Sequence, residues 1–153
     1  MTRQLVGKES RDGKIPGRLF PIFRDREELP VSSDLGSNIN EALRESRYLI
    51  VICSPRAAQS RWVEEEITQF KKLGRENRVL ALIVDGEPNA SDGKPGFETT
   101  DECFPEAMRY RLASSGEAAQ DRTEPIAADA RPDRDGRENA KLKLLAGLLC
   151  INR

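Results

Sequence analysis

The chain has 153 residues, which is long enough for one domain with a buried core. Its 25 basic and 26 acidic residues are mixed along the chain and give a net charge of -1, so it lacks the basic footprint of a nucleic-acid-binding protein. No apolar run approaches the roughly 18 residues of a membrane span, and we expect no membrane partner.

The absence of histidine narrows the possible chemistry further. It excludes Ser-His and Cys-His nucleophile pairs and histidine metal sites, so we expect no bound metal. The three cysteines, Cys53, Cys103 and Cys150, are widely spaced and odd in number, which favours reduced thiols in a cytoplasmic protein. Any catalysis must therefore depend on carboxylates, Lys, Arg, Tyr or a bound ligand.

The first predicted strand is the short apolar run at residues 18–23. Pro21 has no amide hydrogen to donate and makes this a short or edge strand. A polar loop follows at residues 24–33. Apolar positions at helical spacing then predict a helix from Leu35 to about residue 46.

Two continuous apolar runs, residues 48–53 and 79–85, are typical of strands buried on both faces of a parallel sheet. Ser60 is a suitable N-cap for a predicted helix that extends from residue 62 to 73 between them. Residues 86–123 are rich in Gly, Asp, Ser and Pro and predict a long loop with only weak signals of order around residues 103–112. In a compact domain such a loop is either functional or mobile.

The last predicted elements are a strand at residues 125–130 and a helix that starts near Asp135 and has leucines on one face. The alternation of strands and helices predicts an α/β fold with a parallel sheet and right-handed crossovers. We assign residues 1–17 to a polar N-terminal segment and residues 18–150 to a single domain.

Glu66 differs from its neighbours Glu64 and Glu65 in its angle around the predicted helix. Successive helical side chains are offset by about 100°. One apolar arc results, formed by Trp62, Val63, Ile67, Phe70 and Leu73. Glu66 falls inside this arc, and the other two carboxylates fall outside it. A carboxylate among apolar side chains is desolvated, as functional carboxylates often are. The alternative is a rim residue that bends to solvent or pairs with Lys or Arg.

Three stretches, residues 22–29, 46–55 and 60–67, resemble the Toll/interleukin-receptor (TIR) domain of the bacterial type. They read Ile-Phe-Arg-Asp-Arg-Glu-Glu-Leu, Ser-Arg-Tyr-Leu-Ile-Val-Ile-Cys-Ser-Pro and Ser-Arg-Trp-Val-Glu-Glu-Glu-Ile. Their order and spacing fit the family from about residue 18 to 85. The resemblance implies a flavodoxin-like fold, in which helices flank a central parallel sheet.

The resemblance also implies an activity, because active family members are NAD glycohydrolases that cleave the nicotinamide-ribose bond and sometimes cyclise the product. Trp62 and Glu66 match the family's Trp-x-x-x-Glu pattern, in which the Glu is catalytic. NAD would then be a substrate, and no cofactor is expected. Nicotinamide is a good neutral leaving group, so a carboxylate beside an oxocarbenium-like ribosyl centre suffices without histidine.

By the same resemblance, the loop from Arg24 onward lies beside the substrate cleft and contacts neighbouring subunits. Phe23, Arg24 and Asp25 lie at the end of the first predicted strand, where open α/β sheets bind ligands. Arg24 is a candidate phosphate contact and Phe23 a candidate wall for a ring; the alternative is a core Phe and a salt-bridged Arg-Asp pair. We expect Trp62 to shape the cleft by packing more than by stacking on substrate.

Residues 1–17 do not match the strand, roughly Phe-Ile-Ser-Tyr-Ser, and the helix with which the family begins. We therefore expect an N-terminally truncated TIR-like chain without its first strand and helix. A competing hypothesis is a non-catalytic TIR–TIR interaction module that self-associates and transmits a signal. An inactive truncated remnant is a third, so from sequence alone the assignment as an enzyme stays open.

Overall fold

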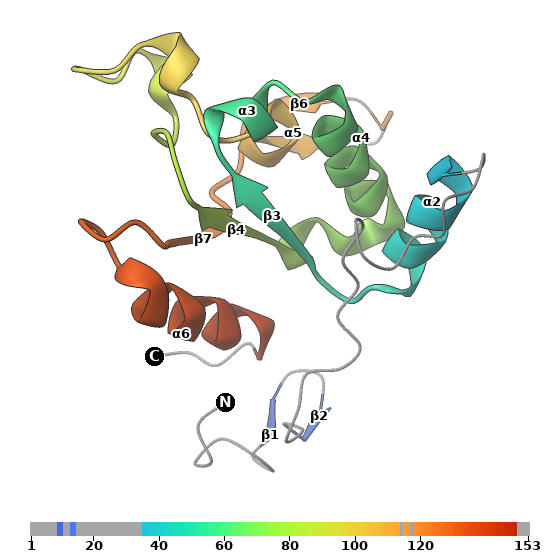
Figure 1. The fold of residues 1–153 in the computed structure, drawn as a ribbon. Helices are drawn as coiled ribbons and strands as arrows, with labels where there is room; N and C mark the ends of the chain where they lie inside the picture. The colour runs from blue at the N-terminus through green and yellow to red at the C-terminus, as the bar shows by residue number, and fades with distance from the viewer. Residues whose placement is uncertain (1–8, 11–12, 15–34, 114, 117, 150–153) are drawn as a thin grey trace.

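A three-stranded parallel sheet lies at the centre of the protein (Figure 1). The computed structural model describes residues 9–10, 13–14, 35–113, 115–116 and 118–149. In the sheet, β4 (Val79–Ile83) lies between β3 (Leu49–Cys53) and β7 (Ile126–Asp129). Three of the four predicted strands and the α/β class are thus confirmed, with boundaries that differ by one or two residues; the strand predicted at residues 18–23 lies outside the described residues.

Helices flank both faces of this sheet (Figure 1). On the core face lie α2 (Leu35–Glu45), α4 (Arg61–Phe70) and the short α5 (Glu106–Arg109). On the opposite face, α6 (Gly136–Leu148) packs against β7 and β4. The predicted helices from residue 35 and from residue 135 are confirmed. Within the described ranges, no helix has the length and apolarity of a membrane span.

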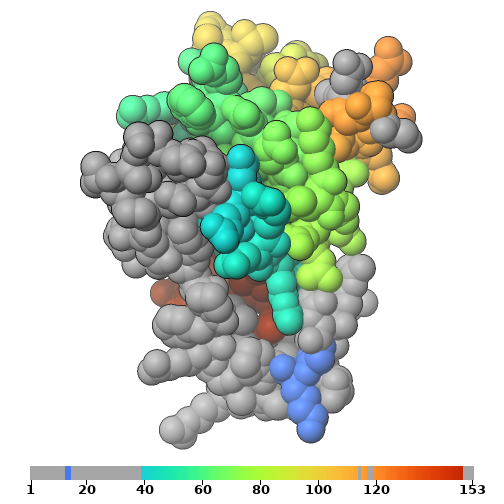
Figure 2. Space-filling model, turned by 90° about the vertical axis from the view of Figure 1, so that its right-hand side faces the viewer, coloured from blue at the N-terminus to red at the C-terminus, as the bar shows by residue number. Residues whose placement is uncertain are grey.

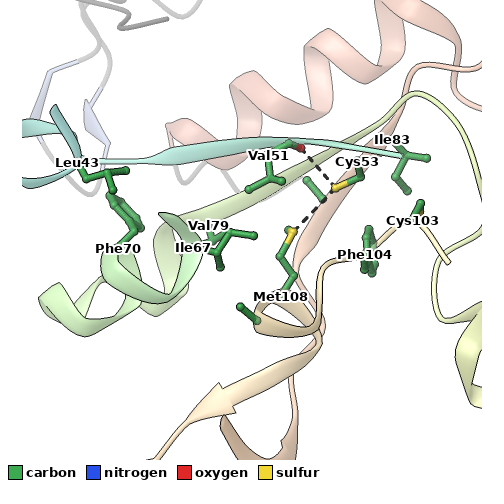
Figure 3. Close-up of a cluster of buried hydrophobic side chains, with 12 residues drawn as sticks. Leu43, Val51, Cys53, Ile67, Phe70, Val79, Ile83, Cys103, Phe104 and Met108 are labelled. Carbon is green, nitrogen blue, oxygen red and sulfur yellow. Dashed lines mark hydrogen bonds between the residues drawn. The ribbon is translucent and has the colours of Figure 1, made fainter. Parts of the chain in front are cut away.

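The main hydrophobic core fills the space between the sheet and the helices of the core face (Figure 3). Ile67 and Phe70 of α4 are fully buried, and Met108 of α5 is nearly so. They pack against Val51 and other side chains of β3 and β4. Full burial of such side chains stabilises the fold by about 1.5–3 kcal/mol each. This packing fixes which side of α4 faces inward and which faces solvent.

Two serine caps set the course of the chain after β3. Ser54 Oγ accepts the backbone N–H of Ala57 at 3.2 Å and starts the short α3 (Pro55–Ala58). Ser60 Oγ accepts the N–H of Val63 at 3.4 Å and starts α4, which confirms the predicted N-cap. Because α3 and α4 follow directly from β3, the first turn of α4 lies near the carboxyl end of that strand (Figure 1).

The helix predicted over residues 62–73 ends earlier than expected. Regular α-helix stops at Phe70, and residues 71–75 form a π-helical turn in which Gly74 has a φ of 76°. Gly74 lies in the left-handed region, so the chain kinks there and the regular 100° offset does not extend through this turn. Leu73 is consequently 40% exposed, and the prediction that it extends the apolar arc was wrong.

Arg75, in this π-helical turn, connects the turn to the carboxyl end of α2 through hydrogen bonds. Its Nη1 donates to the backbone carbonyls of Leu43, Arg44 and Ser46 at 3.2, 2.8 and 2.6 Å. These carbonyls belong to the last turn of α2 and to the residue just after it, where helical carbonyls have no partner within the helix. Figure 2 shows α2 beside the green residues of α4 and the turn after it.

The stretch predicted as a long loop, residues 86–123, contains regular structure. It holds two 3₁₀ turns, α5 and an antiparallel pair of strands, β5 (Tyr110–Leu112) and β6 (Ala118–Arg122). Side-chain bonds to the backbone order much of it. The carboxylate of Glu102 accepts the backbone N–H groups of Asn89, Ser91 and Phe104 at 3.0, 3.2 and 2.9 Å. Such bonds leave no periodic pattern in a sequence.

One face of β3 is more exposed than predicted. Val51 and Cys53 are buried in the core, but Ile50 and Ile52 on the other face are 41% and 61% exposed. On that face α6 packs mainly against β7 and β4. The expectation that this strand is buried on both faces was therefore wrong. In the segment predicted to be polar, β1 (Glu9–Ser10) pairs with β2 (Gly13–Lys14).

Candidate functional site

Trp62 and Glu66 lie one turn apart on α4, the helix whose first turn is near the carboxyl end of β3. Trp62 is 67% exposed, whereas Glu66 is half-buried. The buried side of the helix is centred on Ile67 and Phe70, so Trp62 lies at the margin of the apolar arc and not within it. The expectation that Trp62 mainly packs was wrong, and its indole is available to a ligand.

Arg61 precedes Trp62 and lies over its ring. The guanidinium carbon is 5.3 Å from the ring centroid, which is within the range of a cation-π contact. Both side chains are exposed. The first turn of α4 therefore presents a flat aromatic surface with a positive charge held against it. Arg61 was not among the predicted site residues, although its position next to Trp62 was a usable signal.

Glu64 is the second half-buried carboxylate of α4, and the structure corrects its expected position outside the apolar arc. Burial raises its pKa above the usual 4.5, and the hydrogen bond from the Ala107 N–H opposes this rise. Glu64 Oε1 accepts that N–H at 2.7 Å. The residues around Glu64 belong to α5, more than 40 residues further along the chain. The burial of Glu64 could therefore not be predicted from its angle around α4.

Two substitutions of Glu64 are expected to differ in their effect on stability. The raised pKa of Glu64 favours its neutral form in the folded state, so the associated stability is present below about pH 4.5 and is lost as pH rises through the folded-state pKa. Glu64→Gln keeps an acceptor for the Ala107 N–H and removes this pH dependence. Glu64→Ala leaves the N–H unpaired and lowers the free energy of unfolding by about 1–2 kcal/mol. Urea denaturation at pH 4 and pH 7 measures both, and equal losses in the two variants would contradict this role of the Glu64 carboxylate.

The other predicted site residues, Phe23, Arg24 and Asp25, lie outside the described residues. The structure thus brings together Trp62 and Glu66 of the predicted set. In the described ranges, no group of three or more Cys, Asp or Glu side chains is arranged to hold a metal ion.

A charged cluster that the sequence analysis missed lies at the carboxyl ends of β4 and β7. Arg131 donates from Nε and Nη2 to the Asp129 carboxylate at 2.9 and 2.6 Å, which lowers the pKa of Asp129 and raises that of Arg131. It also donates to the Gly86 carbonyl. Glu87 is buried, with Arg131 and Arg134 at 3.9 and 3.7 Å from its Oε2. These interactions join the segments that follow the two strands.

Two cavities among the described residues lie away from the Trp62 and Glu66 pair on α4. The first, of about 460 Å³, is lined by Glu45, Ser46, Arg47, Arg75 and Arg78. The second, of about 540 Å³, lies between the π-helical turn after α4 and the chain around residues 112–116. Neither is lined by Trp62 or Glu66. Among the described residues, the candidate site therefore lies on a helix face apart from these two cavities.

Comparison with known proteins extends the region of resemblance beyond the predicted residue 85. The family model of the TIR domain matches residues 17–113. A similar protein is the NAD(+) hydrolase ApTIR of Actinoplanes sp., which is 37% identical over 70 residues. That alignment covers 46% of this chain and 10% of the relative, so the chain corresponds to a small part of the larger protein. No solved structure matches the chain. With more than half of its residues matched by the family model and a parallel α/β sheet flanked by helices, the chain belongs to the TIR domain family.

Proposed function

We propose that the protein cleaves the nicotinamide-ribose bond of NAD, with Glu66 as the catalytic carboxylate. The observation that carries this proposal is the half-buried Glu66 one helical turn from the exposed indole of Trp62. Similarity to a protein named as an NAD(+) hydrolase supports the choice of substrate. NAD is the substrate in this proposal, and no metal or further cofactor takes part.

The proposed reaction needs one well-placed negative charge. The bond between C1′ of the ribose and the nicotinamide nitrogen breaks, and its electron pair leaves with neutral nicotinamide. The Glu66 carboxylate stabilises the positive charge that develops at C1′, and its partial burial strengthens that interaction relative to bulk water. Water then adds to C1′ and releases a proton, which gives ADP-ribose. The reaction requires no general acid, in agreement with a chain that lacks histidine.

Trp62 is the proposed platform for the nicotinamide ring. An exposed indole offers a large apolar face for stacking, and its high exposure supports this role over the packing role expected at first. The family resemblance adds Phe23, Arg24 and Asp25 to the proposal as further substrate contacts; these three lie outside the described residues.

The proposal is tested by incubating the purified protein with NAD at high protein concentration and separating the products by chromatography. We expect release of nicotinamide together with linear or cyclic ADP-ribose in equal amounts. The unfolding transition of the same sample, followed by circular dichroism, shows that the protein is folded. A cooperatively folded protein that releases no nicotinamide would contradict the proposal.

Self-association is the second part of the proposal, and a non-catalytic TIR–TIR interaction module is the competing function. The exposed Ile50 and Ile52 on uncharged β3 favour contact with another protein surface. Sedimentation velocity over a range of concentrations, run on the samples used for NAD cleavage, separates the two functions. Association without turnover favours the interaction module, and a strict monomer counts against self-association.

The proposal sets this activity in the cytoplasm. Cys53 and Cys103 are free and buried, and burial raises the pKa of both thiols to about 12. Neutral, buried thiols are inert core residues, which fits a protein of a reducing compartment.

A further inference from the structure

We propose that Arg61 binds the phosphate of the substrate and thereby makes the site selective for nucleotides over nucleosides. This inference rests on the proposed function and extends it to a residue outside the matched Trp-x-x-x-Glu pattern. It starts from the position of the Arg61 guanidinium over the exposed ring of Trp62.

The contact with Trp62 restricts where the positive charge of Arg61 can lie. An exposed arginine side chain samples many rotamers, and a cation-π contact favours those that keep the guanidinium beside the ring. An indole has two faces, so a ligand ring can stack on one while the guanidinium lies on the other. The charge is thus held on the indole face opposite the one proposed to bind nicotinamide, where a phosphate can reach it past the edge of the ring.

The guanidinium is also available to an anionic ligand. Among the described residues, no carboxylate lies within ion-pair distance of Arg61, although Glu65 is four positions further along the helix. Arginine presents a planar set of N–H donors that matches two phosphate oxygens at once. A phosphate is therefore a suitable partner for this side chain.

The spacing along α4 fits a nucleotide whose glycosidic carbon lies at Glu66. Arg61 and Glu66 are five positions apart, which corresponds to about 7.5 Å along the helix axis and about 140° around it. The Arg61 side chain covers part of this angle because it lies over Trp62, which is about 40° from Glu66. The 5′ phosphate of a nucleotide lies a few bonds from its glycosidic carbon, about the length of one helical turn. With C1′ at Glu66 and the base on Trp62, the phosphate extends toward the first turn of α4, where Arg61 lies.

Arg61 contacts a part of the substrate that does not react, so it contributes equally to the ground state and the transition state. The loss of such a contact raises KM and leaves kcat unchanged. We expect Arg61→Ala to raise KM about tenfold for substrates that carry phosphate. Arg61→Lys keeps the charge without the planar donor set, and it recovers part of that loss.

The test compares three substrates: NAD, nicotinamide mononucleotide and nicotinamide riboside, which lacks phosphate. Arg61→Ala is expected to raise KM for the first two and to leave nicotinamide riboside unaffected. Arg56→Ala, which removes another exposed arginine from the preceding α3, is the matched control and is expected to change none of them. An equal effect on all three substrates, or no effect on NAD, would overturn the proposal.

A binding measurement keeps this proposal separate from the failure of catalysis. Trp62 is the single tryptophan of the chain, so its fluorescence reports on ligands at this site. ADP-ribose, which carries phosphates and no nicotinamide, is expected to bind the wild type about tenfold more tightly than it binds Arg61→Ala. If the protein cleaves no substrate but shows this difference, the catalytic proposal fails and the phosphate contact holds. Equal or absent ADP-ribose binding in both proteins overturns the role of Arg61.

Discussion

We expect Glu66→Gln to lower kcat for nicotinamide release at least about 100-fold and to change KM for NAD little. Glutamine has nearly the size and shape of glutamate, so the substitution removes the negative charge and keeps the side-chain volume. A charge aimed at the ribosyl centre acts mainly when positive charge develops there, so its loss affects the transition state more than the bound substrate. Initial rates over a range of NAD concentrations give kcat and KM separately.

Glu65→Gln is the matched control for this experiment. Glu65 is the neighbouring carboxylate of α4 and is exposed, so the same chemical change is made outside the candidate site. It is expected to keep wild-type kcat. Thermal unfolding of both variants separates loss of chemistry from loss of fold. Equal activity of wild type and Glu66→Gln would remove Glu66 from the catalytic role.

Gly86→Ala is expected to lower the free energy of unfolding by about 2–5 kcal/mol, the largest stability effect that we predict. Gly86 has a φ of +81°, which is strained for alanine. An added Cβ would also lie 2.7 Å from the Asp101 carbonyl oxygen and 2.8 Å from Pro55. The backbone oxygen cannot move freely, because it accepts the Glu87 N–H at 2.7 Å. Strain and steric overlap therefore add at this position.

Gly93→Ala separates the two contributions at Gly86. Gly93 has a similar φ of +78°, but nothing lies within 4 Å of the Cβ that alanine would add. Gly93→Ala introduces the conformational strain without steric overlap, so we expect it to lower the free energy of unfolding by about 1–2 kcal/mol. Denaturant unfolding followed by circular dichroism gives both values. A similar decrease in the free energy of unfolding in both variants would contradict a steric contribution at Gly86.

The parts of the fold that the sequence predicted correctly are those with a local periodic pattern. We could predict β3 and β4 from their apolar runs, and α2 and α6 from their helical spacing, without knowing which segments they contact. Ser60 was predicted as an N-cap for the same reason, because its partner is only three residues away. Patterns of this kind depend on chain geometry alone.

Apart from Leu73, which follows from the local turn at Gly74, the errors concern contacts with distant segments. A helical wheel gives the angle between Trp62, Glu64 and Glu66, but it does not say which side α5 will cover. Glu64 is half-buried because Ala107 and its neighbours pack against its side of α4. Trp62 is exposed because little of the described structure packs against its side. The segment around Glu102 is likewise ordered by hydrogen bonds from three separate backbone N–H groups to its carboxylate. No periodic sequence pattern predicts such bonds.

The two exposed isoleucines of β3 also bear on how stability depends on temperature. The heat capacity of unfolding arises mainly from apolar surface that is dry in the folded state and becomes hydrated on unfolding. The exposed fractions of Ile50 and Ile52 are already hydrated in the folded protein, so they add little to that change. A smaller heat-capacity change flattens the curve of stability against temperature. A half-covered sheet thus lowers the maximum free energy of unfolding. The free energy of unfolding also varies less between cold and warm conditions.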